Sequence, residues 1–160
     1  MTYTAPTTEQ LFVLDHTARI DAMAQHERFA AATPDMVEAI VTGIGDFAAE
    51  VYAPLNRVGD VNNPRWEDGK VTMPPGFKEA YRQFVEAGWG SLDGPAAYGG
   101  QDLPFTLATV VIEALGSADM GFTLCNILTP GAIHALMAYG TEEQRQTWLP
   151  KLVTGEWNGT

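Results

Sequence analysis

The sequence is poor in cysteine and in positive charge. Its single cysteine, Cys125, excludes an intrachain disulfide and a zinc site built from paired cysteines. The 9 lysines and arginines face 20 aspartates and glutamates, which gives a formal net charge of −11. An acidic surface repels phosphate groups, so we expect neither nucleic acid nor an anionic membrane surface as a partner.

Long apolar runs are also missing. No uninterrupted stretch approaches the roughly 18 apolar residues of a membrane-spanning helix, so we expect no membrane span. The N-terminal sequence MTYTAPTTEQ lacks the basic and apolar regions of a signal peptide. These two observations favour a cytoplasmic protein. The hydrophobic fraction of 46% and the charged fraction of 18% are typical of a single globular domain of this length.

Apolar residues recur at helical spacing, and no long alternation typical of strands is present. A first helix is predicted over residues 33–54, with Thr33 as its cap and Pro34 in its first turn. Pro54 is expected to end this helix. Residues 55–73 are rich in turn formers and are predicted to form a loop.

The second half of the chain has the stronger helical patterns. The segment 141–152 opens with a capping box formed by Thr141 and Gln144. Together with a short helix or two before residue 33, these patterns predict an all-α bundle of about five or six helices. The other predicted helices cover 77–87, 104–119 and 120–139, the last one broken near Thr129-Pro130-Gly131.

Several isolated residues could carry chemistry, but no complete catalytic or metal-binding set is present. The glycines in GIGDFA (residues 43–48) lie inside a helical pattern, which argues against a dinucleotide-binding turn. Glu113 is a lone charge in an apolar helix and suits either a general base or a structural carboxylate. Cys125 lies in an apolar segment and is predicted to be buried and inert. The three histidines have no nearby second ligand.

An ordered set of motifs is more informative than any single residue. EAGWGSLDGPAAYGGQDLP is followed by the helix that contains Glu113 and then by YGTEEQRQTWLPKLVTGEWNGT. This set resembles the N-terminal helical domain of the acyl-CoA dehydrogenase family over roughly residues 77–160. The resemblance implies three parts: an extension over 1–32, the helical domain over 33–156 and the start of a β-domain over 157–160. The extension resembles the longer bacterial branch, which includes methylthio-acyl-CoA dehydrogenases.

The resemblance implies that the whole protein is a flavin-dependent enzyme that converts an acyl-CoA to a 2-enoyl-CoA. Its implied cofactor is FAD, and its implied partners are the acyl-CoA, an electron-transfer flavoprotein and other copies of itself. In the family the main flavin-binding segments and the catalytic glutamate follow the region matched here. Residues 1–160 alone are therefore expected to be inactive, and no catalytic residue is assigned.

The resemblance also suggests substrate-binding residues in two places. One is the helix that matches the wall of the acyl pocket, and the other is the glycine-rich loop before it. The same side chains could equally pack the bundle or form a plain turn, and a helical partner-binding module without activity is the alternative function. The suggested substrate-binding residues are Leu124, Ile127, Leu128 and Gly131 on the helix and Tyr98, Gly99 and Gly100 in the loop.

Overall fold

The structure is a computed structural model that describes residues 3–159, and its regular secondary structure is mainly helical. The predicted all-α bundle is confirmed. Besides the 3₁₀ turns η1 (Glu27–Phe29) and η3 (Ala96–Tyr98), a π-helical turn η2 (Ala48–Tyr52) and one small hairpin occur in these residues. The α-helices are α1 (Thr7–His16), α2 (Ile20–Met23), α3 (Pro34–Phe47), α4 (Ala53–Val61), α5 (Phe77–Glu86), α6 (Phe105–Ile127), α7 (Thr129–Tyr139) and α8 (Glu142–Val153).

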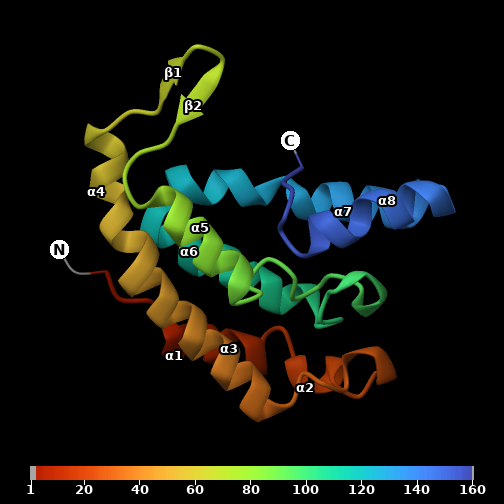
Figure 1. The fold of residues 1–160 in the computed structure, drawn as a ribbon. Coiled ribbons are helices and arrows are strands. Elements are labelled where there is room, and N and C mark those ends of the chain that lie inside the picture. Colours follow the sequence, from red (N-terminus) through yellow and green to blue (C-terminus); the bar gives the residue numbers. More distant parts are fainter. Residues whose placement is uncertain (1–2, 160) are drawn as a thin grey trace.

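The main core lies between the long helices. α3, η2 and α4 form one continuous rod that packs along α6, with α5 beside it (Figure 1). Val41, Ile44 and Tyr52 of the rod are fully buried, as is Leu107 of α6. A second, smaller cluster joins α7 to α8 through Ile133, Leu149, Leu152 and Val153.

Pro54 does not end the first helix, and this prediction was wrong. The chain remains helical from α3 through η2 to Val61, with Pro54 in the first turn of α4. Proline lacks an N–H group and its ring crowds the carbonyl four residues earlier, which normally kinks or breaks an α-helix. Here the wider π-helical turn of η2 precedes the proline and accommodates this misfit without breaking the rod.

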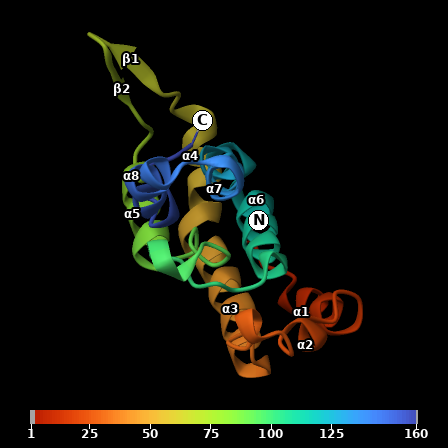
Figure 2. The same ribbon diagram turned by 90° about the vertical axis from the view of Figure 1, so that its right-hand side faces the viewer.

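The predicted loop over 55–73 was also wrong, because it contains the end of α4 and a β-hairpin. Strands β1 (Arg65–Glu67) and β2 (Lys70–Thr72) pair antiparallel, with Trp66 opposite Val71. The two turn residues, Asp68 and Gly69, have φ angles of 47° and 76°. Asp-Gly favours such a two-residue turn because both positions need positive φ. The hairpin projects from the body of the molecule (Figure 2), and all of its strand residues are exposed.

Helix α6 contains a kink at the boundary predicted between residues 119 and 120. Asp119 has a non-helical backbone, with φ −152° and ψ 91°, but the helix continues beyond it. Its Oδ1 accepts a hydrogen bond from the amide of Phe122 at 3.1 Å, and its carbonyl accepts one from the hydroxyl of Thr123 at 2.8 Å. Asp119 therefore acts as an internal N-cap for the second half of α6.

The stretch Phe105–Tyr139 is long and apolar enough to cross a membrane by length and composition alone. Of its most apolar window, 61% is buried inside the fold, as in the core helix of a compact domain. The stretch is therefore weak evidence for a membrane span.

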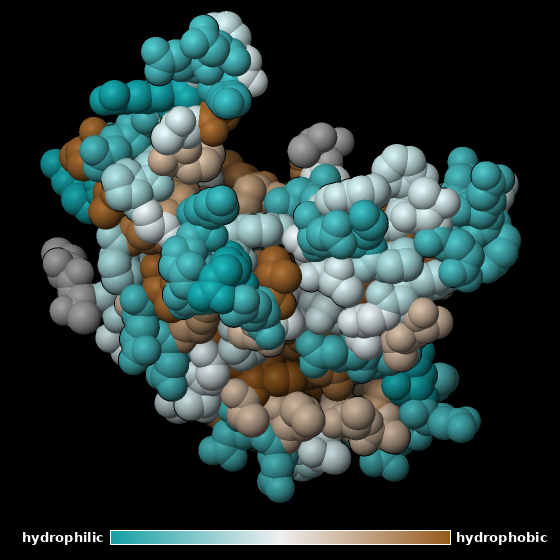
Figure 3. Space-filling view, viewed as in Figure 1, coloured by the Kyte–Doolittle hydropathy of each residue, from teal (hydrophilic) through white to brown (hydrophobic). Residues whose placement is uncertain are grey.

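The segment before α3 belongs to the same packed unit. Leu14, Ile20 and Ala32 are buried in the main core, and the hydroxyl of Tyr3 donates a hydrogen bond to the carbonyl of Ala114 at 3.0 Å. On the face drawn in Figure 3, hydrophobic side chains gather in a recess beneath α5, while hydrophilic side chains cover the hairpin and the far end of α8.

Candidate functional site

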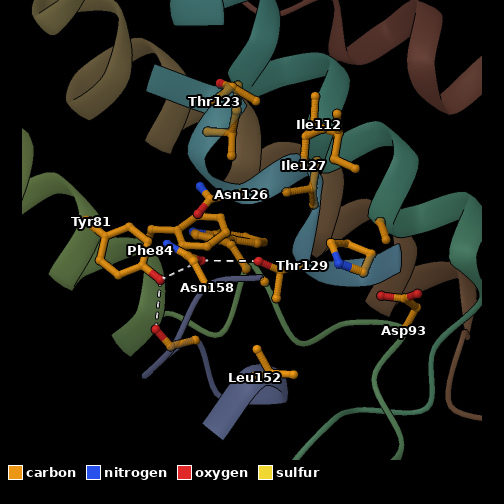
Figure 4. A pocket seen from close by; sticks show the side chains of 17 residues that line it. Tyr81, Phe84, Asp93, Ile112, Thr123, Asn126, Ile127, Thr129, Leu152 and Asn158 are labelled. Carbon is orange, nitrogen blue, oxygen red and sulfur yellow. Dashed lines mark hydrogen bonds between the residues drawn. The ribbon is translucent and has the colours of Figure 1, made fainter. Parts of the chain in front are cut away.

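A narrow pocket lies between α5, α6, the start of α7 and the segment that follows α8. Its free volume is about 50 Å³. At about 10–15 Å³ for each water-sized group, this space accommodates on the order of four such groups. Most of the lining is apolar; Phe84, Ile112 and Leu152 contribute to it from three different elements (Figure 4).

One side of the pocket is a single helical stripe. Thr123, Asn126, Ile127 and Pro130 all line it; Asn126 and Ile127 lie three and four residues after Thr123, and Pro130 lies three residues after Ile127. Side chains at these spacings lie on the same face of a helix, and the stripe continues from α6 into α7. Thr123 is buried, and its hydroxyl is satisfied by the carbonyl of Asp119.

Only one of the four suggested wall residues, Ile127, lines this pocket. Leu124 and Leu128 are each 57% exposed and lie on another face of α6. Gly131 is exposed, and a Cβ atom built on it would meet no heavy atom within 4 Å. The suggested set and the stripe that faces the pocket are thus offset by about one residue, and the assignment of Leu124, Leu128 and Gly131 to the substrate stays a prediction.

The three suggested loop residues lie apart from the pocket lining. Tyr98 packs against the small cluster of α7 and α8. Gly99 has a φ of 92°, which favours glycine. A Cβ atom on Gly100 would lie 2.0 Å from the carbonyl oxygen of Gly94. The backbone at residue 100 can therefore pack this closely against residue 94 only if residue 100 is glycine. The glycines of this loop thus have a structural reason, and the loop residue that lines the pocket is Asp93.

Polar groups gather where the segment after α8 crosses the pocket. The hydroxyl of Tyr81 lies 2.7 Å from the carbonyl oxygen of Gly155 and 3.1 Å from Oδ1 of Asn158, so these two acceptors share its single proton. Thr129 donates to the same Oδ1 at 3.2 Å and accepts from the amide of Gly159 at 3.1 Å. Figure 4 shows this chain of hydrogen bonds between α5, α7 and the final segment.

The other candidate residues are distributed over separate places. Asp93 pairs with His134 at 3.2 Å beside the pocket. Glu113 lies outside the lining and accepts a hydrogen bond from Gln10 of α1 at 3.2 Å, which gives it a structural partner. Cys125 is exposed, so the prediction of a buried thiol was wrong. No group of three or more metal-ligating side chains occurs among the residues that the structure describes.

The lining decides which ligands the pocket suits. It contains no lysine or arginine, and Asp93 is its single acidic side chain. A diphosphate needs positive charge or free backbone N–H groups, so this pocket does not fit the diphosphate of a flavin dinucleotide. Apolar walls with a polar group at one end are typical of sites for a small apolar chain.

Comparison with known proteins identifies relatives for this chain. Residues 34–156 match the family model described as Acyl-CoA dehydrogenase, N-terminal domain. The chain is 40% identical over 160 residues to a protein of Ruegeria pomeroyi named 3-methylmercaptopropionyl-CoA dehydrogenase. The aligned region covers 100% of this chain and 27% of that protein.

Two other relatives match a shorter part of the chain. It is 35% identical over 111 residues to an isobutyryl-CoA dehydrogenase of Dictyostelium discoideum, covering 69% of this chain and 24% of that protein. It is 33% identical over 109 residues to a short/branched chain specific acyl-CoA dehydrogenase of Rattus norvegicus, covering 68% and 23%. The chain therefore spans about a quarter of the length of these relatives.

Proposed function

Because the chain belongs to the acyl-CoA dehydrogenase family and corresponds to its N-terminal helical domain, we propose that it forms part of the acyl pocket of a longer enzyme. That enzyme would remove two hydrogens from an acyl-CoA and produce a 2-enoyl-CoA. The observation that supports this role is the narrow, mainly apolar pocket beside the stripe of Thr123, Asn126 and Ile127. Within the proposed enzyme, these residues bind and orient the acyl chain and exclude water from it.

The proposed substrates have short acyl chains. A free volume of about 50 Å³ suits a tail of a few heavy atoms. The printed names of three relatives agree with this size: isobutyryl-CoA, short/branched chain and 3-methylmercaptopropionyl-CoA dehydrogenase. The full-length match with the last of these makes a methylthio-acyl-CoA the first substrate to test.

We further propose FAD as the cofactor, an electron-transfer flavoprotein as the electron acceptor and a homo-oligomer as the assembly. A bound flavin would take up the hydride that leaves the β-carbon. No residue in the described part of this chain is assigned to the flavin, because the pocket does not suit its diphosphate. This part of the proposal depends on the family alone.

The function is tested with the full-length protein, an artificial electron acceptor and two substrates, butyryl-CoA and 3-methylthiopropionyl-CoA. Mass spectrometry should detect products lighter by two hydrogen atoms. Ile127→Arg should lower kcat/KM by about 10-fold or more, because a charged side chain fills an apolar site. Gln146→Arg, at an exposed polar position of α8 outside the pocket lining, is the control and should change kcat/KM by less than about 3-fold. Absence of product with both substrates would contradict the proposal.

The alternative is a helical module that binds a partner without catalysis. Its support is the exposure of Leu124, Leu128 and Trp66. The same exposure is expected wherever the rest of a longer protein packs on this domain. A native mass spectrum from the source organism separates the two: a flavin-free species of 17.3 kDa supports the module, and a species several times heavier that carries FAD supports the enzyme.

A further inference from the structure

A second cavity lies on the other side of Tyr81. Its free volume is about 630 Å³, and it is formed by the segment between β2 and α5 together with the second half of α6. It is lined mainly by apolar residues, among them Met73, Pro74, Phe77 and Phe122. The narrow pocket described above, with about 50 Å³, is therefore next to a larger space, which is open to solvent along Val71 and Met73.

The two cavities share two lining residues, Tyr81 and Asn158. Helix α6 also lies between the two cavities. Thr123 and Asn126 line the narrow pocket, whereas Phe122 and Cys125 line the large cavity. Tyr81 and Asn158 thus form a partition between the two spaces.

Hydrogen bonds hold this partition in place from three elements. Tyr81 of α5 reaches the carbonyl of Gly155 at 2.7 Å, and Thr129 of α7 reaches Oδ1 of Asn158 at 3.2 Å. Tyr81 is half-buried, and its ring lies 6.1 Å from that of Phe84 in a stacked arrangement. Because both the ring and the hydroxyl of Tyr81 are fixed, the partition does not depend on a single contact.

We propose that Tyr81 and Asn158 determine chain-length specificity by keeping the acyl chain out of the large cavity. With the partition in place, the narrow pocket accepts only short tails. Removing the Tyr81 ring joins the two apolar spaces and provides room for a longer tail. This inference rests on the proposed dehydrogenase function and names residues that limit its substrates.

The experiment measures kcat/KM of the full-length protein for butyryl-, hexanoyl-, octanoyl- and decanoyl-CoA. The readout is the ratio of the decanoyl to the butyryl value, which cancels a general loss of activity. Tyr81→Ala should raise this ratio by about 10-fold or more, since each added methylene in an apolar site is worth about 10-fold or more in specificity. Tyr81→Phe keeps the ring and should leave the ratio within about 3-fold of the wild type.

Asn158→Gly provides a second test should Tyr81→Ala fail to fold. Asn158 is exposed, so its removal opens the partition with little effect on the core, and the ratio should rise by a smaller factor. The inference is overturned if the variants that fold keep the wild-type ratio. It is also overturned if the wild type oxidises decanoyl-CoA as well as butyryl-CoA. Failure of the proposed function itself gives a different result, because the wild type then oxidises none of the four substrates.

Discussion

In the second half of α6, two faces differ in a way that runs against hydrophobicity. The face that lines the narrow pocket carries Thr123, Asn126 and Ile127. The face turned to the surface carries Met120, Leu124 and Leu128, at spacings of four residues and 53–57% exposed. In this half of the helix the more apolar of these two faces is therefore the exposed one, whereas in the first half apolar residues such as Val111 and Leu115 are buried. The comparison teaches that burial in this helix is decided by which elements pack against it, and that its exposed stripe suits coverage by another part of a longer protein.

The largest expected effect contrasts a buried leucine with an exposed one on the same helix. Leu115 is 2% exposed and lines the pocket, so Leu115→Ala should lower the free energy of unfolding by about 2–5 kcal/mol. Leu124→Ala should change it by less than about 0.5 kcal/mol. Urea unfolding of residues 1–160 measures both values, and equal losses would show that the two faces do not differ in burial.

A smaller effect is expected at the kink that sets the direction of the second half of α6. Asp119→Ala removes the cap on the amide of Phe122, which should cost about 1–2 kcal/mol. Asp119→Asn keeps an oxygen acceptor and should remain within about 0.5 kcal/mol of the wild type. The measurement is again urea unfolding, and a loss for Asn as large as for Ala would argue against the capping role.

The hydroxyl of Thr123, a residue that lines the pocket, is expected to contribute less to stability. Thr123→Val keeps the shape of the side chain but loses the 2.8 Å hydrogen bond to the carbonyl of Asp119. The expected loss in the free energy of unfolding is about 1 kcal/mol. Thr109 offers a control, because its hydroxyl bonds to the carbonyl of Phe105 at an exposed position. Thr109→Val should therefore have a smaller effect, and the reverse order would contradict this account of Thr123.

The smallest effect on stability is expected on the exposed stripe. Leu124→Lys should change the free energy of unfolding of residues 1–160 by less than about 0.5 kcal/mol, because both side chains remain in water. It should also reduce self-association of this fragment, measured by analytical ultracentrifugation, since it interrupts the exposed stripe. A large loss of stability would mean that Leu124 is covered within the fragment.

The parts of the fold that depend on local sequence could be predicted. Thr33 caps α3, and Thr141 and Gln144 form the capping box of α8, as expected. The Asp68-Gly69 turn is an equally local signal for a hairpin, but it was hidden within a polar segment that was interpreted as a loop. The continuation of the helical rod past Pro54 could not be predicted, because it depends on a π-helical turn for which the sequence carries no recognisable signal.

The candidate site could be predicted only in part, for a physical reason. An apolar helix gives no periodicity from which to infer the face that will be buried, so the set suggested from the sequence includes Ile127 but not Thr123 and Asn126, which line the same pocket. The partition depends on contacts between residues far apart, such as Tyr81 and Asn158, which are 77 positions apart in the chain. Tyr81 lies in the helix predicted over residues 77–87, but nothing in the sequence pairs it with Asn158.

The hydrogen bonds of Thr129 also bear on the chemical ageing of the protein. Asn-Gly sequences deamidate when the backbone nitrogen of the glycine attacks the side-chain amide carbon of the asparagine. In Asn158-Gly159 that nitrogen donates to Thr129, and the Asn158 side chain is held by the same hydroxyl. The folded chain therefore fixes both reacting groups in hydrogen bonds that the attack would have to break, and this site should deamidate mainly in molecules whose final segment has opened.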